Sequence, residues 1–317
     1  MSTSAPAATR PDQAAPSKTP HTRRQLTPWA LLSPAGLVVL VITIVPIALL
    51  IFYSFTDYDQ RSLFTGEWSA VGLDQYGQIF TSSAFWHSVL RTLWFTAALV
   101  IGTMLIGAGV AQLMTRITSW LRYVVTIILV LAWGVPNVAS SVVWNFLFEP
   151  GYGIVNWLLT QLHIFGDMTS TDWGNSTPLA FTSIWLLIVW QAVPFVALTL
   201  YAALLQVPDG PVEAAYIDGA SEWRIWWNIK LAYLRPTLLL IVILSIIWDA
   251  NVFNQIWLVS EGGPDESTST LGVYTFKKAF VGFDVGTGAA ISVVTTVLLI
   301  VVTSVYIRNL LRAGEDL

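Results

Sequence analysis

The chain has 317 residues, of which 55% are hydrophobic and only 11% are charged. Soluble domains carry roughly 25% charged residues, so this composition, with a mean hydropathy of +0.66, indicates a membrane protein. The net charge of −4 is small and diffuse, which argues against nucleic-acid binding. The absence of cysteine excludes disulfides and thiolate sites. The three histidines, His21, His87 and His163, have no metal-ligand spacing.

The first 25 residues are rich in Ala, Pro, Ser and Thr and include Arg10, Lys18, Arg23 and Arg24. This composition predicts a disordered tail over residues 1–25. The apolar run that follows is too long for the h-region of a cleaved signal and lacks a good small-residue cleavage site. We therefore expect a cytoplasmic tail, an uncleaved first span and a membrane domain over residues 26–317.

Six apolar runs are each long enough for a helix of about 20 residues to cross a bilayer. Five of them contain no Asp, Glu, Lys or Arg, and the fifth in chain order contains Asp249. The sequence therefore predicts an all-α integral membrane protein with six spans. The predicted limits are 29–55, 92–113, 123–147, 180–204, 237–259 and 287–308.

Lys and Arg are enriched on the cytoplasmic side of membrane proteins. With the N-terminus inside, eleven of the 15 Lys and Arg residues fall on the inner side of the predicted spans. We therefore expect a multi-pass protein of the cytoplasmic membrane with both termini in the cytoplasm. The polar stretch 208–236 then lies inside as well.

The stretch 208–236 separates two long apolar blocks and carries several charged side chains, so it is expected to lie in water. Its pattern predicts two short helices joined by a hinge. Asp209 can cap the first helix, Gly219 can end it in the left-handed conformation, and Ser221 can cap the second. Pro236 marks the expected entry into the next span. An ordinary loop between spans is the alternative reading of this pattern.

The fifth span offers the best set of polar groups for a substrate path, because polar groups inside a span usually face a cavity or a partner. At about 100° per residue, Trp248, Asn251, Asn254 and Gln255 share roughly one third of a helical wheel. Such a face suits a sugar, whose hydroxyls need donors and acceptors and whose rings stack on indoles. Asp249 points almost the opposite way and is expected to be structural unless the helix is broken there.

Weaker candidates for the path lie in other spans. Asn145 and Gln191 lie in spans with proline kinks, whose carbonyls can open onto a cavity. Ser292 belongs to a small-residue patch over 286–292, for which close helix packing is the main expectation. No catalytic set, metal site or phosphate-binding GxxxxGK[ST] loop is present in the sequence.

Two motifs give the chain a family resemblance. Glu213-Ala214-Ala215, Asp218-Gly219-Ala220 and Ile229-x-Leu231 resemble the EAA loop of the permease subunits of ATP-binding-cassette (ABC) importers. The chain departs from that pattern at Ala232, where the family usually has proline. The stretch from Glu261-Gly262-Gly263-Pro264 to Phe280 resembles the carbohydrate-importer branch, particularly its maltose-permease-like members. The resemblance covers residues 29 to 312.

The resemblance implies the type I importer fold, with a cytoplasmic coupling helix that seats in a groove of an ATPase subunit. The implied coupling residues are Glu213, Ala214, Ala215, Asp218, Gly219, Ala220, Trp226 and Ile229. The implied partners are a second homologous permease, two ATP-binding ATPase subunits, an extracytoplasmic solute-binding protein and membrane lipid. No cofactor is expected on this chain, because ATP and Mg²⁺ belong to the ATPase subunits.

The expected function is that of a permease subunit for a mono- or oligosaccharide, with Asn251 the best match to a substrate contact of the family. The same class of importer for glycerol-3-phosphate or a polyol is the first alternative. An ion-coupled secondary transporter is the second alternative, and it has thin support because Asp249 is the one acid within the spans. A membrane enzyme is disfavoured by the lack of any catalytic set.

Overall fold

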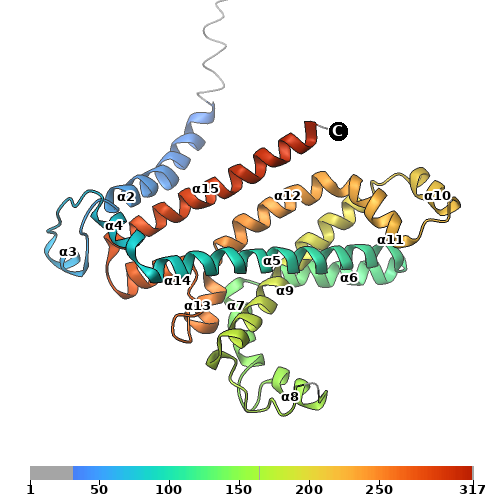
Figure 1. The fold of residues 1–317 in the computed structure, drawn as a ribbon, viewed down its shortest axis with the longest axis horizontal. Helices are drawn as coiled ribbons and strands as arrows, with labels where there is room; N and C mark the ends of the chain where they lie inside the picture. Colours follow the sequence, from blue (N-terminus) through green and yellow to red (C-terminus); the bar gives the residue numbers. More distant parts are fainter. Residues whose placement is uncertain (1–30, 164, 316–317) are drawn as a thin grey trace, which may run out of the picture. The chain divides into compact units, whose positions relative to one another are not determined.

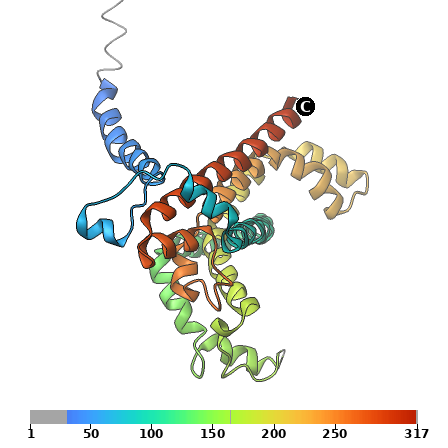
Figure 2. The same ribbon diagram turned by 60° about the vertical axis from the view of Figure 1, so that its left-hand side comes forward.

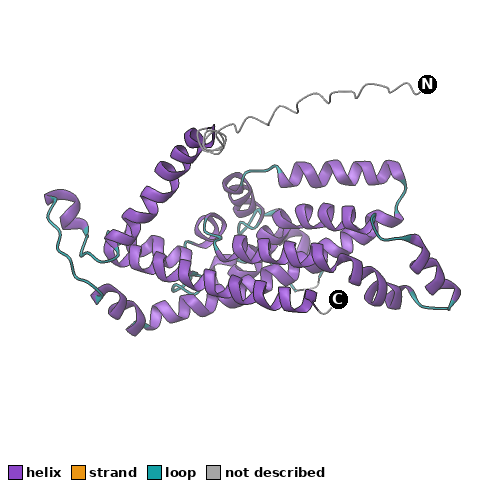
Figure 3. Cartoon of the chain, turned by 90° about the horizontal axis from the view of Figure 1, so that it is seen from above, coloured by secondary structure: helices purple, strands orange, loops and turns teal. Residues whose placement is uncertain are grey.

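In a computed structural model, the structure describes residues 31–163 and 165–315. The regular elements of these residues are helices, and one isolated antiparallel bridge joins Thr56 and Ala70 (Figure 3). The predicted tail, residues 1–25, lies outside the described residues. Residues 1–49 and 50–317 form separate contact units, so each is considered by itself, and a single domain over residues 26–317 stays a prediction.

The helices follow one another along the whole described chain. The first runs over Leu31–Tyr53 and includes a π-helical turn at Leu40–Ile44 and α2 at Val45–Tyr53. The others are α3 (Gln60–Thr65), α4 (Asp74–Thr81), α5 (Ser83–Arg116), α6 (Ser119–Trp133), α7 (Asn137–Leu147), α8 (Ile154–Gln161), α9 (Thr177–Leu204), α10 (Asp209–Ile217), α11 (Glu222–Ile225), α12 (Leu231–Ala250), α13 (Asn254–Ser260), α14 (Leu271–Phe276) and α15 (Val285–Glu315) (Figure 1). Short 3₁₀ or π-helical turns lie at Trp173–Asn175, Trp226–Lys230 and Lys277–Val281.

Within the described residues, five helices are long and apolar enough to cross a membrane. The predicted third span, 123–147, is not one straight helix, because α6 and α7 meet at 99° and make a sixth span only if they are counted together. The cause is local: Pro136 has an extended ψ of 138°, and a proline has no N–H to continue the hydrogen bonds of the preceding helix. The sequence located this kink but not the size of the turn.

The predicted fifth span, 237–259, is also corrected. Its helix starts earlier, at Glu222, and ends at Ala250, and after a short non-helical segment the chain continues as α13. Pro236 lies inside α12, which is tolerated in membrane helices because neighbouring groups satisfy the freed carbonyl. The Asn251 amide Nδ2 donates to the Ile247 carbonyl at 2.7 Å, so the side chain replaces a backbone partner where the helix stops.

The helices α5 and α9 cross and form the centre of the unit (Figure 2). Two glycines of α5 let α9 come close, as small residues do between membrane helices. The Trp185 indole occupies the space where a Cβ on Gly102 would lie, and Val196 Cγ1 lies 2.6 Å from the ideal Cβ position on Gly107. A buried cluster on this crossing extends to α13 and α14 through Ile256 and Val273.

Two further clusters hold the remaining helices. One joins α4, α5, α14 and α15 around Phe85, Leu271 and Ile291. The predicted packing of the small-residue patch is confirmed here, since Gly288 lies so close to Ala279 that a Cβ would approach it to 2.5 Å. The other cluster joins α5, α9 and α12. Because α9 belongs to two clusters, it is held firmly beside the cavity described next.

Candidate functional site

The polar stretch 208–236 begins with the predicted short helix and hinge, whereas the predicted second short helix is the start of the long helix Glu222–Ala250. Gly219 has φ +74°, and the Ala220 N–H donates to the Ala215 carbonyl at 2.9 Å, which is the Schellman ending of a helix. Ser221 Oγ accepts from the Arg224 N–H at 3.4 Å, so the predicted second cap is confirmed. The prediction for Asp209 is wrong: Pro208 is the N-cap, and Asp209 lies inside the first turn, where its charge favours the helix dipole.

The predicted coupling residues divide into two groups. Glu213, Ala214, Asp218 and Gly219 are exposed on and after α10, and Ala215 and Ala220 are half-buried. Trp226 and Ile229 are half-buried as well, and Trp226 packs against the cluster shared by α5, α9 and α12. The structure thus places Trp226 against the permease itself.

Two large apolar side chains of this segment are strongly exposed. Ile217 is 87% exposed and Trp223 is 71% exposed. Apolar side chains in a polar, water-facing segment are a signal of contact with another protein. Ile217 was missed in the sequence, and its position in the polar stretch 208–236 is the signal by which it could have been found.

An ion pair fastens the coupling segment to the end of α5. Arg116 Nη2 lies 2.7 Å from Glu222 Oε2, and the Tyr216 hydroxyl donates to the other oxygen of the same carboxylate. This hydrogen bond raises the pKa of the Tyr216 hydroxyl above its ordinary value. Glu222 therefore connects α5, α10 and α11, a link between residues 106 apart that no local pattern predicts.

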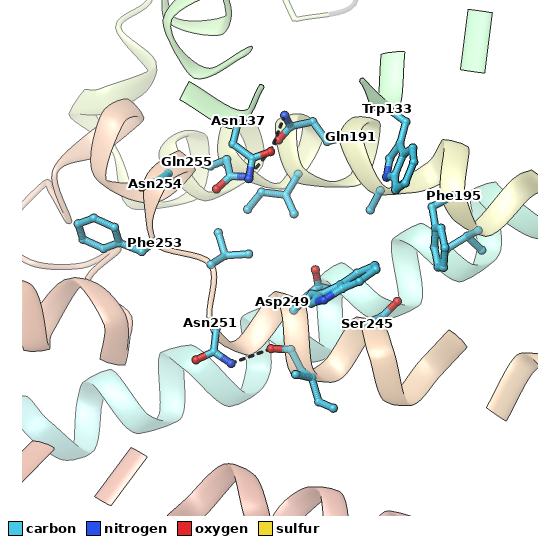
Figure 4. A pocket seen from close by; sticks show the side chains of 16 residues that line it. Trp133, Asn137, Gln191, Phe195, Ser245, Asp249, Asn251, Phe253, Asn254 and Gln255 are labelled. Atoms are coloured by element: carbon cyan, nitrogen blue, oxygen red, sulfur yellow. Dashed lines mark hydrogen bonds between the residues drawn. The ribbon is translucent and has the colours of Figure 1, made fainter. Parts of the chain in front are cut away.

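A large cavity lies where the α6–α7 and α12–α13 breaks face α9 (Figure 4). Its volume is about 690 Å³, within the usual range of small-molecule sites. It is lined by Trp133, Asn137, Ile188, Gln191, Ala192, Phe195, Val196, Ser245, Ile247, Trp248, Asp249, Asn251, Val252, Phe253, Asn254 and Gln255. Three indole or phenyl rings form one wall: Phe195 lies 6.0 Å from Trp133 and 5.4 Å from Trp248, between ring centroids.

Six of the eight predicted path residues line this cavity, namely Trp248, Asp249, Asn251, Asn254, Gln255 and Gln191. The prediction that Trp248, Asn251, Asn254 and Gln255 share one helical face is wrong. The break after Ala250 places Trp248 and Asp249 on α12 and turns Asn254 and Gln255 onto α13. Asp249, expected to point away, lines the same cavity.

The other two predicted residues lie elsewhere. Asn145 Nδ2 donates to the Leu258 carbonyl at 2.7 Å, and the side chain lines a smaller cavity of about 170 Å³ beside Trp144 and Trp173. Ser292 Oγ donates to the Gly288 carbonyl of its own helix at 3.0 Å and does not line the large cavity. Both hydrogen bonds have a structural role in packing.

A chain of amides crosses the cavity wall. Gln255 Nε2 donates to Gln191 Oε1 at 3.0 Å, and Gln191 Nε2 donates to Asn137 Oδ1 at 3.3 Å (Figure 4). Gln191 Nε2 also donates to Ser140 Oγ at 2.8 Å. The chain joins α13, α9 and α7. Ser140 was missed as a site residue, whereas Asn137 belongs to the kinked segment of the third predicted span, which the sequence marks as a weaker candidate for the path.

Comparisons with known proteins agree with this architecture. The family model described as "Binding-protein-dependent transport system inner membrane component" matches residues 103–313. The diacetylchitobiose uptake system permease protein DasB of Streptomyces coelicolor is 36% identical over 291 residues, covering 92% of this chain and 88% of DasB. The sulfoquinovosyl glycerol transport system permease protein SmoG of Agrobacterium fabrum is 31% identical over 278 residues, covering 88% of both chains.

Solved structures support the same fold. A chain of a bacterial ABC transporter that imports the acidic polysaccharide alginate superposes with a TM-score of 0.76, covering 92% of this chain and 96% of that chain at 17% identity. The family match covers well over half of the chain and includes the coupling segment and the lining residues of the cavity. The chain therefore belongs to the inner membrane components of binding-protein-dependent transport systems, the permease subunits of ABC importers.

Proposed function

We propose that this chain forms, with a second homologous permease, the path for a mono- or oligosaccharide across the cytoplasmic membrane. As a permease component, it has no catalytic site or cofactor of its own, and ATP is hydrolysed on separate ATPase subunits. The observation that carries the proposal is the cavity of about 690 Å³. Aromatic rings and side-chain amides line it, and its lining residues include no Lys, Arg or His.

The chemistry of this wall suits a sugar. Sugar hydroxyls need both donors and acceptors, and Gln191, Asn254 and Gln255 offer both on one amide group. The C–H faces of a pyranose pack on aromatic rings, and Trp248 is 51% exposed at the cavity. DasB and SmoG are named for the uptake of diacetylchitobiose and the transport of sulfoquinovosyl glycerol, which supports a saccharide for this chain as well.

We propose that α10 and the turn after it seat in a groove of an ATPase subunit. The exposed Glu213, Asp218 and Ile217 offer charged and apolar contacts there. This assignment places the stretch 208–236 and both termini in the cytoplasm, in agreement with the Lys and Arg distribution. Closure of the ATPase dimer can drive the permease only if it has a higher affinity for one permease conformation.

Glycerol-3-phosphate or a polyol is the alternative substrate. A phosphate group is bound most often through Arg or Lys side chains, and the cavity wall of this chain supplies neither. The second permease would have to provide the positive charge. Membership of the ABC importer family argues against the ion-coupled alternative.

The test is ATP-dependent uptake by the reconstituted complex of both permeases, the ATPase and the binding protein, with Glu213→Lys and Asn251→Ala as variants. We expect Glu213→Lys to lose ATPase co-purification or its stimulation. Asn251→Ala is expected to assemble normally and to lose most uptake. Normal assembly and transport by Glu213→Lys would reduce α10 to an ordinary loop, and uptake that stops with a protonophore while ATP persists would contradict the whole proposal.

A further inference from the structure

We propose that Arg91 and the aromatic rings beside it form a binding site for a phospholipid with an anionic headgroup. The guanidinium binds the phosphate group, and the rings pack against the first part of an acyl chain. The inference goes beyond the proposed function, because it concerns the surface that the chain turns toward the bilayer and not the central cavity.

The site is a cavity of about 570 Å³ between the first part of α5, the start of α9 and the loop before α14. Aromatic rings form much of its wall, and Arg91 is the one charged side chain among the described residues that line it. Trp94 of α5 packs edge-on against Phe181 of α9, with 4.6 Å between the ring centroids. Trp94 is nevertheless 48% exposed, so its ring is open to a ligand.

The first observation is that Arg91 has no partner among the described residues. It forms no hydrogen bond, ion pair or cation–π contact with them, although the residue is half-buried. Arg61, by contrast, donates from Nη2 to Glu67 Oε2 at 2.8 Å. A guanidinium carries five N–H donors, and partial burial removes some of the water that would satisfy them. An anion that accepts from these donors is therefore bound favourably.

The second observation is the depth of Arg91 in the membrane. No charged residue lies between Arg91 and Arg116 on α5. At 1.5 Å per residue, the two arginines are about 38 Å apart along the helix, slightly more than the roughly 30 Å of a bilayer core. Arg116 pairs with Glu222 of the coupling segment at one end. Arg91 therefore lies at the headgroup level of the opposite leaflet, where Trp side chains are also enriched.

These two observations identify the class of ligand. Phosphate oxygens form charge-assisted and often bidentate hydrogen bonds with arginine. An anionic headgroup has no cation of its own to compete with Arg91, so it is preferred over a zwitterionic one. The apolar wall distinguishes a lipid from free phosphate, because an acyl chain removes the exposed Trp94 ring from water. A carboxylate of a neighbouring subunit would satisfy Arg91 but would leave that ring uncovered.

The experiment places a fluorescent label at Thr182, an exposed residue that lines the cavity. Because the chain contains no cysteine, Thr182→Cys gives it one attachment point for a bimane label, in a complex whose other subunits are cysteine-free. The assembled importer in detergent is titrated with brominated phosphatidylglycerol or brominated phosphatidylcholine, whose bromine atoms quench a nearby label. We expect half-maximal quenching by phosphatidylglycerol at a concentration at least about fivefold lower than by phosphatidylcholine.

Variants of the labelled complex assign the preference to one side chain. Arg91→Gln removes the charge, so the two lipids should quench at equal concentrations, whereas Arg91→Lys should keep most of the preference. Arg61→Gln is the matched control, because that arginine is exposed and already paired with Glu67, and it should leave the preference unchanged. Trp94→Ala should weaken quenching by both lipids alike, because it removes contact with the acyl chain and keeps the charge.

The outcomes decide between a lipid and the other possible anions. A preference lost in Arg91→Gln and retained in Arg91→Lys and Arg61→Gln supports the site. Equal quenching by both lipids in the unsubstituted labelled complex, or a preference that persists in Arg91→Gln, would overturn it. Relief of quenching by inorganic phosphate would show a site for a free anion instead. Loss of the second permease from the Arg91→Gln complex, with lipid quenching unchanged, would assign Arg91 to a contact between subunits.

Discussion

The coupling segment and the central cavity differ in how their geometry arises. The turn within the segment over 208–236 is built by interactions between residues three to five positions apart, such as the Ala220 to Ala215 hydrogen bond and the Ser221 cap, and the Arg116–Glu222 ion pair fastens the segment to α5. The cavity wall is built by contacts between residues 51 and 64 positions apart, such as Gln191 with Ser140 and Gln255 with Gln191. The first region is therefore tolerant of changes elsewhere, and the second depends on how α7, α9 and α13 are packed.

This difference predicts how each region fails. A change at the centre of the α5–α9 crossing acts on the whole unit, because that crossing supports the cavity. A change in the coupling segment acts on a few exposed residues and leaves the unit folded. Four substitutions test this contrast, from the largest expected effect to the smallest.

Gly102→Ala should destabilise the protein by about 2–3 kcal/mol, as overpacking of a tight interface does. The new Cβ would meet the Trp185 ring, and that ring is fixed because its Nε1 donates to the Ala98 carbonyl at 2.9 Å. The midpoint of thermal unfolding in detergent micelles measures the effect. The control is Gly109→Ala in the same helix, where a Cβ meets nothing within 4 Å; equal midpoints for both variants would contradict the close crossing.

Gln191→Leu should cost about 1–2 kcal/mol, because it leaves buried amides without partners. Gln255 is 6% exposed and loses its acceptor. Uptake by the reconstituted complex should fall by at least about tenfold, since three elements of the wall lose their link. The matched control is Gln206→Leu, at an exposed glutamine just after the end of α9. A similar loss of uptake in that variant would show that the amide chain has no special role.

Gly219→Ala should cost about 1 kcal/mol, because a side chain in the left-handed conformation is strained. The expected result is faster hydrogen exchange of the α10 amides and weaker stimulation of the ATPase, with unchanged saccharide binding. Gly210→Ala, at a glycine of α10 without positive φ, is the control. Loss of saccharide binding in Gly219→Ala would break the proposed independence of the two regions.

Glu222→Gln should have the smallest effect, under about 1 kcal/mol, because both partners of the Arg116–Glu222 pair are about half exposed. Raising the salt concentration should weaken the native pair in the same way. Hydrogen exchange over residues 216–225, compared between native protein and variant at low and high salt, measures it. A large loss of global stability in the variant would mean that this ion pair supports the core, contrary to its exposure.

The sequence predicted the coupling segment well because its signals are local. The Gly219 turn and the Ser221 cap follow from residue type and spacing alone, and both are present. Asp209 shows the limit of such reasoning: a good capping residue lost the position to Pro208, because the chain enters the helix one residue earlier. The packing role of the small-residue patch was also predictable, because small residues such as Gly288 let two helices approach closely.

The break after Ala250 could not be located from sequence. The segment around Asn251 contains no glycine or proline, and its apolar character continues through Trp257, so a continuous span was the natural reading. The free energy lost with the helical hydrogen bonds at this break is offset by the packing of α13 against α7 and α9 and by the hydrogen bond from Asn145 to Leu258. These contacts are not visible in the sequence. The positions of Asn145 and Ser292 outside the cavity have the same origin, because their partners lie on surfaces that a wheel diagram does not contain.

By itself, the sequence determined the class of protein, the places of most of its spans, and the short helix and glycine turn that begin its polar coupling segment. These follow from hydrophobic run length and from turn chemistry, which act over a few residues. Only the tertiary structure decided that Asp249 shares a cavity with Gln191 and Gln255, and that the described residues lining this cavity include no Lys, Arg or His. The physical reason is that two helix breaks, 99° at the first, reorient side chains from four helices, and the energy for those breaks comes from contacts between segments far apart in the chain.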